Sequence, residues 1–246
     1  LFQLAGENYT DYLRYEKLPV TCKYFFENNK SFIAYSDPEK FYPELQQLSG
    51  EDLMRVKQYL ANAEKLYTHA GAIFLNKSLH KISTWFNKDI LSVLKVTRLS
   101  YILKTLSSYN QQKLKSPEVQ QIFNRYATYN GSSPFKAPGM LSLIPHLEFN
   151  RGVFYPLGGM QKIADAVFAL AQKTGVHFEF NAPAQRIIHS EGKARGIVAH
   201  HQNHFADAVV SNADIYVTYK HLLGNEVKSQ KVLKAERSSS ALIFYW

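Results

Sequence analysis

Apolar residues recur every three or four positions in three stretches of the chain, which is the spacing of one face of an α-helix. The first stretch follows Ser49, whose hydroxyl can cap a helix start while Asp52 completes a capping-box pattern. The second begins with Pro117 after Ser116, and the third stops at Gly175, a suitable residue for a helix end. Their apolar positions are Leu53, Val56, Leu60, Ala63, Leu66 and Ala70; Val119, Ile122, Phe123 and Tyr126; and Met160, Ile163, Ala164, Val167, Leu170 and Ala171. We expect three amphipathic helices with these stripes buried.

Other segments carry different local signals. Aromatic residues crowd residues 9–35 and are broken by polar residues and Pro19, which predicts short strands or irregular structure. A turn signal precedes Pro38, which opens a short predicted helix ending before Pro43. We expect the first 130 residues to be mainly helical, and residues 130–159, rich in glycine and proline, to form a loop-rich connector.

The residue pattern after Gly175 is typical of strands. Val176–Phe180 alternates apolar and polar residues, and Gln185–His189 and Ala194–Ala199 flank a turn at Glu191-Gly192 as a hairpin. Asp207–Val210 resembles a buried strand. Helix, strand, hairpin and strand together predict the α/β fold class, as the late part of a Rossmann-like nucleotide-binding domain with an inserted β-meander. Because the apolar run Ser240–Trp246 has no turn after it, we expect an internal fragment whose last strand pairs with sequence outside this chain.

Composition is that of a globular protein with a large core. Of 246 residues, 46% are hydrophobic, and 16 Tyr and 16 Phe supply ample apolar surface, which argues against disorder. Core packing explains the aromatic excess more simply than a ligand tunnel does. Cys22 is the only cysteine, which excludes an internal disulfide and a thiolate zinc site. No apolar run approaches the ~20 residues of a spanning helix, and we expect any membrane contact to be peripheral.

The formal charge of +9 is concentrated in one segment. Asn76–Lys115 holds eight basic residues and a single acid, Asp89, interleaved with apolar residues at helical spacing. Such a segment can lie in an anionic membrane interface, through Lys88, Lys95 and Arg98 among others, or can be an ordinary surface helix with a solvated lysine face. Nucleic acid is a poorer partner for this charge, because no zinc-finger, helix-turn-helix or aromatic RNA-binding motif is found.

Three motifs in order carry a family resemblance. Tyr155-Pro-Leu-Gly-Gly-Met160 precedes a helix, Gly175-Val176 follows it, and Asp207–Asp214 comes next. This order resembles the phytoene dehydrogenase family of carotenoid desaturases, in the flavin amine oxidase superfamily. Residues 125–138, with Arg125-Tyr-Ala-Thr-Tyr and Ala137-Pro138, are similar to the hydroxycarotenoid 3,4-desaturase branch.

The resemblance implies an FAD-binding Rossmann domain interrupted by a substrate domain, and removal of hydrogen from a C40 polyene. It assigns residues 1–154 to the mainly helical substrate and membrane-binding domain, 155–214 to the FAD-binding domain and 215–246 to a return to the substrate domain. Since a carotenoid is held in the bilayer, it also favours the membrane interpretation of Asn76–Lys115, at the surface of a cytoplasmic, peripheral enzyme. One departure is clear: no G-x-G-x-x-G motif occurs, so this chain alone should bind FAD weakly or not at all.

Five residues are candidates for cofactor contact. Gly158 and Gly159 can simply turn the chain into the helix, or can lie beside the flavin ring and let backbone approach it. Ala184 stands where related flavoproteins often have a valine that contacts adenine through its backbone amide. Asn212 and Asp214 follow a predicted strand, where they either form a turn or contact the cofactor.

The remaining polar candidates carry no site assignment. His200, His201 and His204 lack a carboxylate partner in register, so we expect no metal site. Neither His146 nor Glu148 is assigned a catalytic role, and the catalytic residues stay unassigned. Two alternatives remain for the function: another flavin amine oxidase-type oxidoreductase, or a non-catalytic lipid-binding module.

Overall fold

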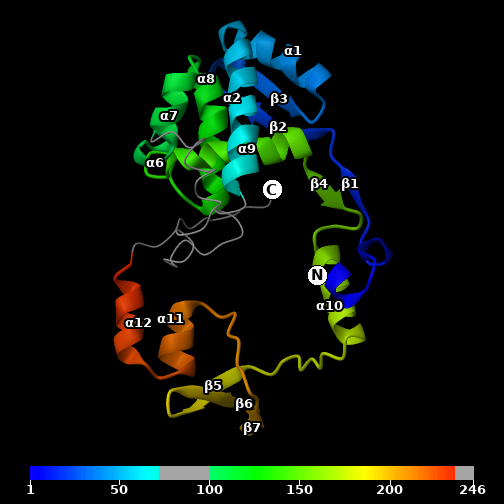
Figure 1. Ribbon diagram of the computed structural model, residues 1–246, viewed down its shortest axis with the longest axis vertical. Helices are drawn as coiled ribbons and strands as arrows, with labels where there is room; N and C mark the ends of the chain where they lie inside the picture. The colour runs from blue at the N-terminus through cyan, green and yellow to red at the C-terminus, as the bar shows by residue number, and fades with distance from the viewer. Residues whose placement is uncertain (72–99, 236–246) are drawn as a thin grey trace. The chain divides into compact units, whose positions relative to one another are not determined.

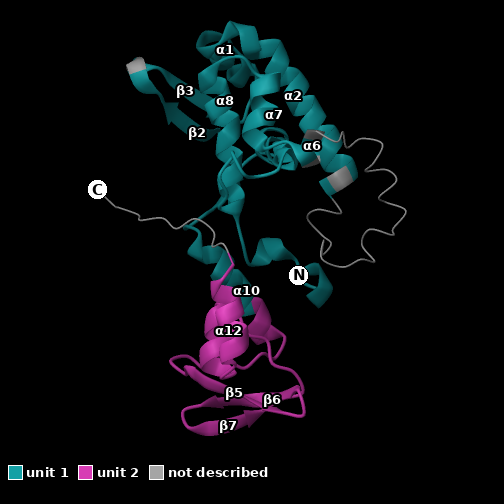
Figure 2. Ribbon diagram, turned by 90° about the vertical axis from the view of Figure 1, so that its left-hand side faces the viewer, with its two compact units in different colours: residues 1–169, 239–246 teal, residues 170–238 magenta. Residues whose placement is uncertain are grey.

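The computed structural model describes residues 1–71 and 100–235 (Figure 1). The chain divides into two compact units, residues 1–169 and residues 170–238, which are coloured separately in Figure 2. Ser240–Trp246, predicted to be a strand, lies outside the described residues. All sheets among the described residues are antiparallel, and helices of various lengths make up most of the remainder.

The core of the first unit begins with a hairpin. β2 (Val20–Phe25) pairs with β3 (Ser31–Tyr35) across a 3-10 turn, Glu27–Asn29, and α1 (Pro38–Leu48) packs on β3. Buried positions on β3 and α1 meet in one cluster: Phe32, Ala34, Phe41 and Leu45. The predicted end of this helix before Pro43 is wrong, since α1 continues through Pro43 to Leu48 while its apolar residues Phe41 and Leu45 are buried.

The helix α2 (Leu53–Leu66) buries four of the predicted positions, Val56, Leu60, Ala63 and Leu66, but lacks the predicted cap. The Ser49 side chain makes no capping bond, and a 3-10 turn, Gly50–Asp52, precedes the helix. The carboxylate of Asp52 is fully buried and accepts hydrogen bonds from the backbone N–H groups of Lys115, at 2.8 Å, and Ser116, at 2.6 Å. The capping box is therefore wrong, because distant backbone donors occupy the carboxylate that it required.

Short helices complete the helical core, and Figure 1 shows α1, α2, α7 (Leu106–Lys113) and α8 (Pro117–Asn124) gathered beside the β2–β3 hairpin. The helix predicted after Ser116 is confirmed: the Ser116 hydroxyl accepts from the N–H of Val119, and Pro117 is the first helical residue. The other elements in this region are the helices α6 (Ser100–Leu103), α7 (Leu106–Lys113), α8 (Pro117–Asn124) and α9 (Ile144–His146), the 3-10 segments η6 (Arg125–Asn130) and η7 (Gly139–Leu143), and the π-helix η8 (Leu147–Arg151).

A two-stranded ribbon leads out of this core. β1 (Tyr15–Lys17), which follows the 3-10 turns Gln3–Ala5 and Tyr9–Asp11, pairs with β4 (Phe154–Pro156). α10 (Gln161–Lys173) then ends at Gly175, whose φ is +88°, as the sequence predicts. The predicted burial of its apolar stripe is only partly right. Of the predicted positions, Leu170 is buried and Ala171 half-buried, whereas Met160, Ile163, Ala164 and Val167 are exposed.

The second unit contains the predicted β-meander, in the order β5 (Ala184–Ser190), β6 (Lys193–Ala199) and β7 (Gln202–Phe205). Both of its two-residue turns have positive φ, at Glu191-Gly192 and at His200-His201, which suits the right-handed twist of the strands. Gly196 is required on β6, since a Cβ there would lie 2.1 Å from the carbonyl oxygen of His204. Three helical segments follow: α11 (Ile215–Val217), η9 (Thr218–Leu222) and α12 (Glu226–Leu233).

Two predicted strands of this region are absent from the described structure. Val176–Phe180 and Asp207–Val210 are irregular, and Val210 is 94% exposed. A strand exists only as part of a hydrogen-bonded ladder, and no described strand pairs with either segment. Both predictions are therefore wrong for this structure.

Candidate functional site

The glycine pair forms a tight turn between β4 and α10. Gly158 and Gly159 have φ values of +87° and +97°, a region that side-chain-bearing residues rarely adopt. The N–H of Gly159 donates to the carbonyl of Pro156 at 3.0 Å, and that of Leu157 donates to the carbonyl of Arg14 at 2.9 Å. The turn role expected for the glycines is confirmed, and both positions require glycine for conformational reasons.

The backbone of this turn is open to a ligand. A Cβ built on Gly158 would have only the flexible side chain of Lys162 nearby, at 3.4 Å, and one on Gly159 only the hydroxyl of Tyr155, at 3.8 Å. Lys162 is itself paired with Asp165, 2.9 Å away, and this hydrogen bond lowers the pKa of the Asp165 carboxyl. The turn therefore leaves its backbone open on the side where the missing Cβ atoms would lie.

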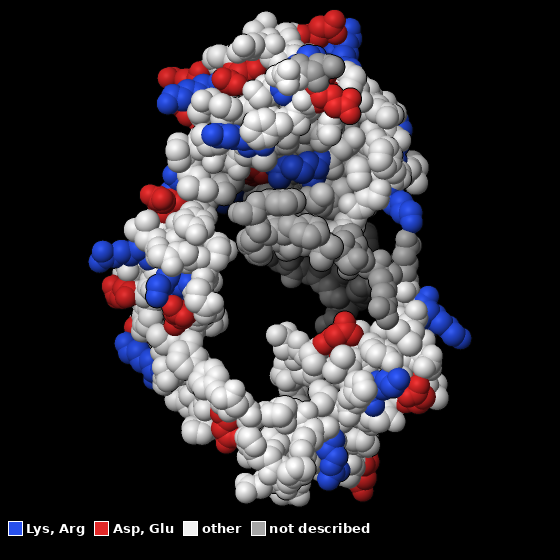
Figure 3. Space-filling model, turned by 180° about the vertical axis from the view of Figure 1, so that it is seen from behind, with Lys and Arg blue, Asp and Glu red and all other residues white. Residues whose placement is uncertain are grey.

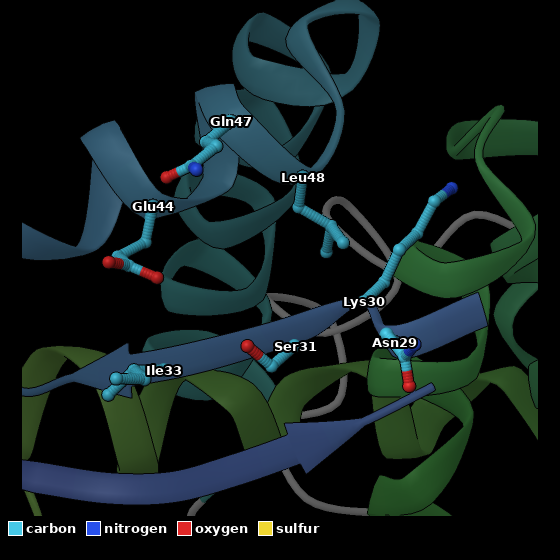
Figure 4. A pocket seen from close by; sticks show the side chains of 7 residues that line it. All are labelled: Asn29, Lys30, Ser31, Ile33, Glu44, Gln47 and Leu48. Atoms are coloured by element: carbon cyan, nitrogen blue, oxygen red, sulfur yellow. The ribbon is translucent and has the colours of Figure 1, made fainter. Parts of the chain in front are cut away.

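Two of the hollows in the described part of the first unit are relevant to ligand binding. One, of about 470 Å³, adjoins the glycine turn and is lined by residues 10–14, Leu157 and Lys162. The other, of about 430 Å³, lies between β3 and α1 (Figure 4). Its lining is mostly polar: Asn29, Lys30, Ser31, Ile33, Glu44, Gln47 and Leu48. Because Lys30 is bound to Glu118 at 2.6 Å, its charge is already neutralised. The hollow beside the turn is the better placed of the two for cofactor chemistry.

The other three candidate cofactor residues belong to the second unit. Ala184 begins β5, opposite Ala199, and is exposed. Asp214 accepts a hydrogen bond from the N–H of Tyr216 at 2.8 Å and so caps α11, which is the turn-forming role weighed for it. Asn212 is exposed in the irregular segment before it. The structure therefore divides the five candidates between its two units.

The histidines of the meander have structural positions. His200 and His201 form the turn between β6 and β7, and the N–H of His201 donates to the side-chain oxygen of Gln185 at 3.1 Å. Nε2 of His204, on β7, is buried without a partner. Throughout residues 1–71 and 100–235, no group of three or more His, Cys, Asp or Glu residues could hold a metal ion.

A buried ion pair, which the sequence analysis did not single out, organises the segment that leads to β4. Arg125, at the start of η6, donates to both carboxylate oxygens of Glu148 on η8, at 2.9 and 2.8 Å. The same carboxylate accepts from the hydroxyls of Tyr126, at 3.1 Å, and Tyr129, at 2.9 Å, while Arg125 also donates to Tyr24. In the sequence, this pair is visible only as an isolated arginine, Arg125, and an isolated acid, Glu148, each next to residues of the core.

Burial raises the pKa of Tyr126 well above its ordinary value of 10, and the negative charge of Glu148 raises it further. Tyr126 therefore stays protonated, and a donor, at any physiological pH. His146, nearby on α9, is buried against Tyr67, and desolvation lowers its pKa. Since His146 and Glu148 both lie within the core, neither is exposed to a substrate.

The three predicted membrane-facing residues, Lys88, Lys95 and Arg98, lie outside the described residues. The described end of their segment is partly core, since its apolar residue Leu106 is fully buried. Figure 3 shows basic and acidic side chains interspersed on the described part of one face. Within the described ranges, no helix has both the length and the apolar character needed to cross a bilayer.

Comparisons with known proteins agree on a family. Residues 1–243 match the family model for the flavin containing amine oxidoreductases. The whole chain is 43% identical to 1-hydroxycarotenoid 3,4-desaturase from Flavobacterium sp. (strain P99-3), of which it covers 50%. It is 27% identical, over 98% of its length, to hydroxyneurosporene desaturase from Rubrivivax gelatinosus, covering 47% of that protein. The chain thus spans about half the length of the curated relatives it matches.

A solved structure supports the fold alone. An oxidoreductase from Methanosarcina mazei superposes with a TM-score of 0.53 at 16% sequence identity, over 90% of this chain and 45% of that one. At this identity, the likeness concerns the arrangement of the elements and not their chemistry.

Proposed function

We propose, because the chain belongs to the flavin containing amine oxidoreductase family, that it is the middle portion of an FAD-dependent carotenoid desaturase. The observation that carries this proposal is the 43% identity, along the whole chain, to a protein named as a 1-hydroxycarotenoid 3,4-desaturase. Hydroxyneurosporene and phytoene desaturases are among the other relatives, which supports a polyene as the substrate class.

Bound FAD would supply the chemistry of accepting a hydride from the polyene while a proton leaves the neighbouring carbon. The turn at Gly158 and Gly159 suits the flavin ring, because its backbone is open and lacks Cβ atoms. Ala184 would contact adenine through its backbone, and Asn212 and Asp214 would lie near the cofactor. This chain contains no G-x-G-x-x-G motif. The pyrophosphate would therefore be held in the half of the relatives' length that this chain does not span.

Two parts of the proposal concern location. A carotenoid dissolved in the bilayer must be drawn from a membrane, and the basic segment Asn76–Lys115 would hold the enzyme on anionic lipid as a peripheral, cytoplasmic protein. The division into a substrate domain over 1–154, an FAD domain over 155–214 and a return over 215–246 belongs to the same proposal.

An assay of the full-length protein tests the function. Purified enzyme with FAD is mixed with acyclic carotenoids in liposomes and an electron acceptor such as a quinone, and the absorbance spectrum is followed. A shift to longer wavelength, with the mass falling by two hydrogens, is expected for each double bond added. If the carotenoids stay unchanged while an amine is oxidised, the other flavin amine oxidase activity is the correct one. Retention of carotenoid without any flavin or turnover would identify a lipid-binding module.

A further inference from the structure

Two exposed tyrosines form a hydrogen-bonded pair, Tyr9 on the 3-10 turn Tyr9–Asp11 and Tyr15 on the ribbon that leads to the glycine turn. The hydroxyls of Tyr9 and Tyr15 are 3.1 Å apart, and their rings stack with centroids 6.1 Å apart at an angle of 15°. The ring of Phe154 packs edge-on against Tyr15, at 5.5 Å and 85°. All three rings are open to solvent, with 43%, 44% and 48% of their surface exposed. Neighbouring exposed aromatic side chains of this kind can mark a ligand-binding surface.

The chemistry of the pair is specific. Either hydroxyl can donate the bond between them, and neither has another hydrogen-bond partner among the described residues. Each phenol oxygen therefore keeps free lone pairs, and one hydroxyl hydrogen is free to reach a ligand. A group that both donates and accepts, such as an alcohol, satisfies this pair better than a carboxylate or an ammonium group.

The pair lies close to the proposed flavin site because of strand register. Tyr15 is paired with Pro156 across the ribbon, and Lys17 with Phe154, which places Tyr15 and Phe154 on one face. Gly158 follows Pro156 by two residues, or roughly 7 Å of extended chain. Tyr15 thus lies on the same ribbon as the glycine turn, opposite the residue two positions before Gly158.

We propose that Tyr9 and Tyr15 bind the terminal hydroxyl of a hydroxylated polyene, with Phe154 packing on the first part of its chain. The inference rests on the proposed function and identifies the residues that would determine substrate specificity. It is consistent with the name of the 43% identical relative, 1-hydroxycarotenoid 3,4-desaturase, which gives both the position of the hydroxyl and the position of the new double bond. A hydroxyl on carbon 1 is only two carbons from the bond between carbons 3 and 4, so the group that binds it must lie near the hydride acceptor.

The test compares two substrates in the full-length, FAD-loaded enzyme. Tyr9→Phe, Tyr15→Phe and the double variant remove the hydroxyls and keep the rings. Tyr42→Phe is the matched control, because Tyr42 lies on α1, outside the pair and the hollow beside the glycine turn. For a 1-hydroxylated acyclic carotenoid, kcat/KM of the double variant should fall roughly tenfold, as expected for a lost hydrogen bond. For the same polyene without the hydroxyl, kcat/KM should not change, and Tyr42→Phe should match the wild type with both.

An equal fall with both substrates, or no fall with either, would overturn the inference. A binding measurement separates this outcome from failure of the proposed function. Immobilised protein is incubated with each carotenoid in detergent, and the retained pigment is extracted and measured by absorbance. If the wild type turns over neither substrate, desaturation is refuted. Selective retention of the hydroxylated polyene that disappears in the double variant would still support the site, and unchanged retention would refute it.

Discussion

Nη2 of Arg125 lies 2.9 and 2.8 Å from the two carboxylate oxygens of Glu148, and the Glu148 side chain is only 4% exposed. Most of residues 139–151, predicted as part of a loop-rich connector, is instead helical, and Glu148 lies in its last segment, η8, just before β4. The pair therefore joins η6 to η8, which leads into the two-stranded ribbon of β1 and β4 and the glycine turn.

Removal of one partner of this pair should be strongly destabilising. Glu148→Ala leaves the guanidinium of Arg125 partly buried without a counter-ion and takes the acceptor from Tyr126 and Tyr129. We expect a loss of about 3–5 kcal/mol in the free energy of unfolding, measured by urea denaturation. Replacement of both partners, as Arg125→Met with Glu148→Leu, should cost much less, since no charge is left buried. A loss below about 1 kcal/mol for Glu148→Ala would show that the network does not stabilise the fold.

The pair between Lys30 and Glu118 should give a measurable pH dependence. Hydrogen bonds from Lys30 and Ser116 lower the pKa of Glu118 from 4.5 to about 2. Because the folded pKa is below the unfolded one, the stabilisation is complete above pH 4.5 and is lost as the pH falls toward 2. Since the Lys30 side chain is half exposed, we expect the effect to be at most about 1 kcal/mol.

Urea denaturation at several pH values within this window measures the effect. Glu118→Gln should show a shallower loss of stability with falling pH than the wild type does. Identical slopes for the two proteins would mean that the ion pair contributes nothing.

The glycine turn can be tested through the cofactor. Gly159→Ala in the full-length protein should strain the backbone and place a methyl group where the flavin ring would lie, and we expect the bound FAD to fall severalfold. Gly175→Ala is the matched control, because its φ of +88° carries similar strain while no atom lies within 4 Å of the added Cβ. The flavin absorbance per protein, at equal thermal stability, is the measurement. Equal flavin losses in the two variants would place the cofactor elsewhere.

Membrane docking is expected to depend on the basic segment. Each lysine or arginine near an anionic surface contributes about 1 kcal/mol, so Lys88, Lys95 and Arg98 changed together to Glu should abolish co-sedimentation with phosphatidylserine vesicles. The binding of the wild type should also fade in 1 M salt, where the Debye length is about 3 Å.

A control for this experiment must change the net charge by the same amount. Lys40, Lys193 and Lys234 are exposed in the described structure, and their reversal to Glu should leave vesicle binding nearly intact. If both triple variants bind as the wild type does, the segment has no part in docking.

Local signals explain what could be predicted from the sequence. The helix after Ser116, the helix end at Gly175 and the hairpin at Glu191-Gly192 all form as expected. Capping hydroxyls, a proline in the first helical position and residues that accept positive φ act within a few positions of themselves. The glycine turn is likewise set by the residues that form it. The order of motifs that indicated the family is also a property of the sequence alone.

Only the tertiary structure decided which distant groups meet. The sequence holds no sign that the Asp52 carboxylate binds the backbone at Lys115 and Ser116, that Arg125 reaches Glu148, or that Tyr9 pairs with Tyr15. The strand predicted at Val176–Phe180 fails for the same reason, since alternation shows which face could be buried but not whether a neighbouring strand exists. Hydrogen bonds of this kind depend on spatial proximity, which the chain acquires only when its helices and strands pack.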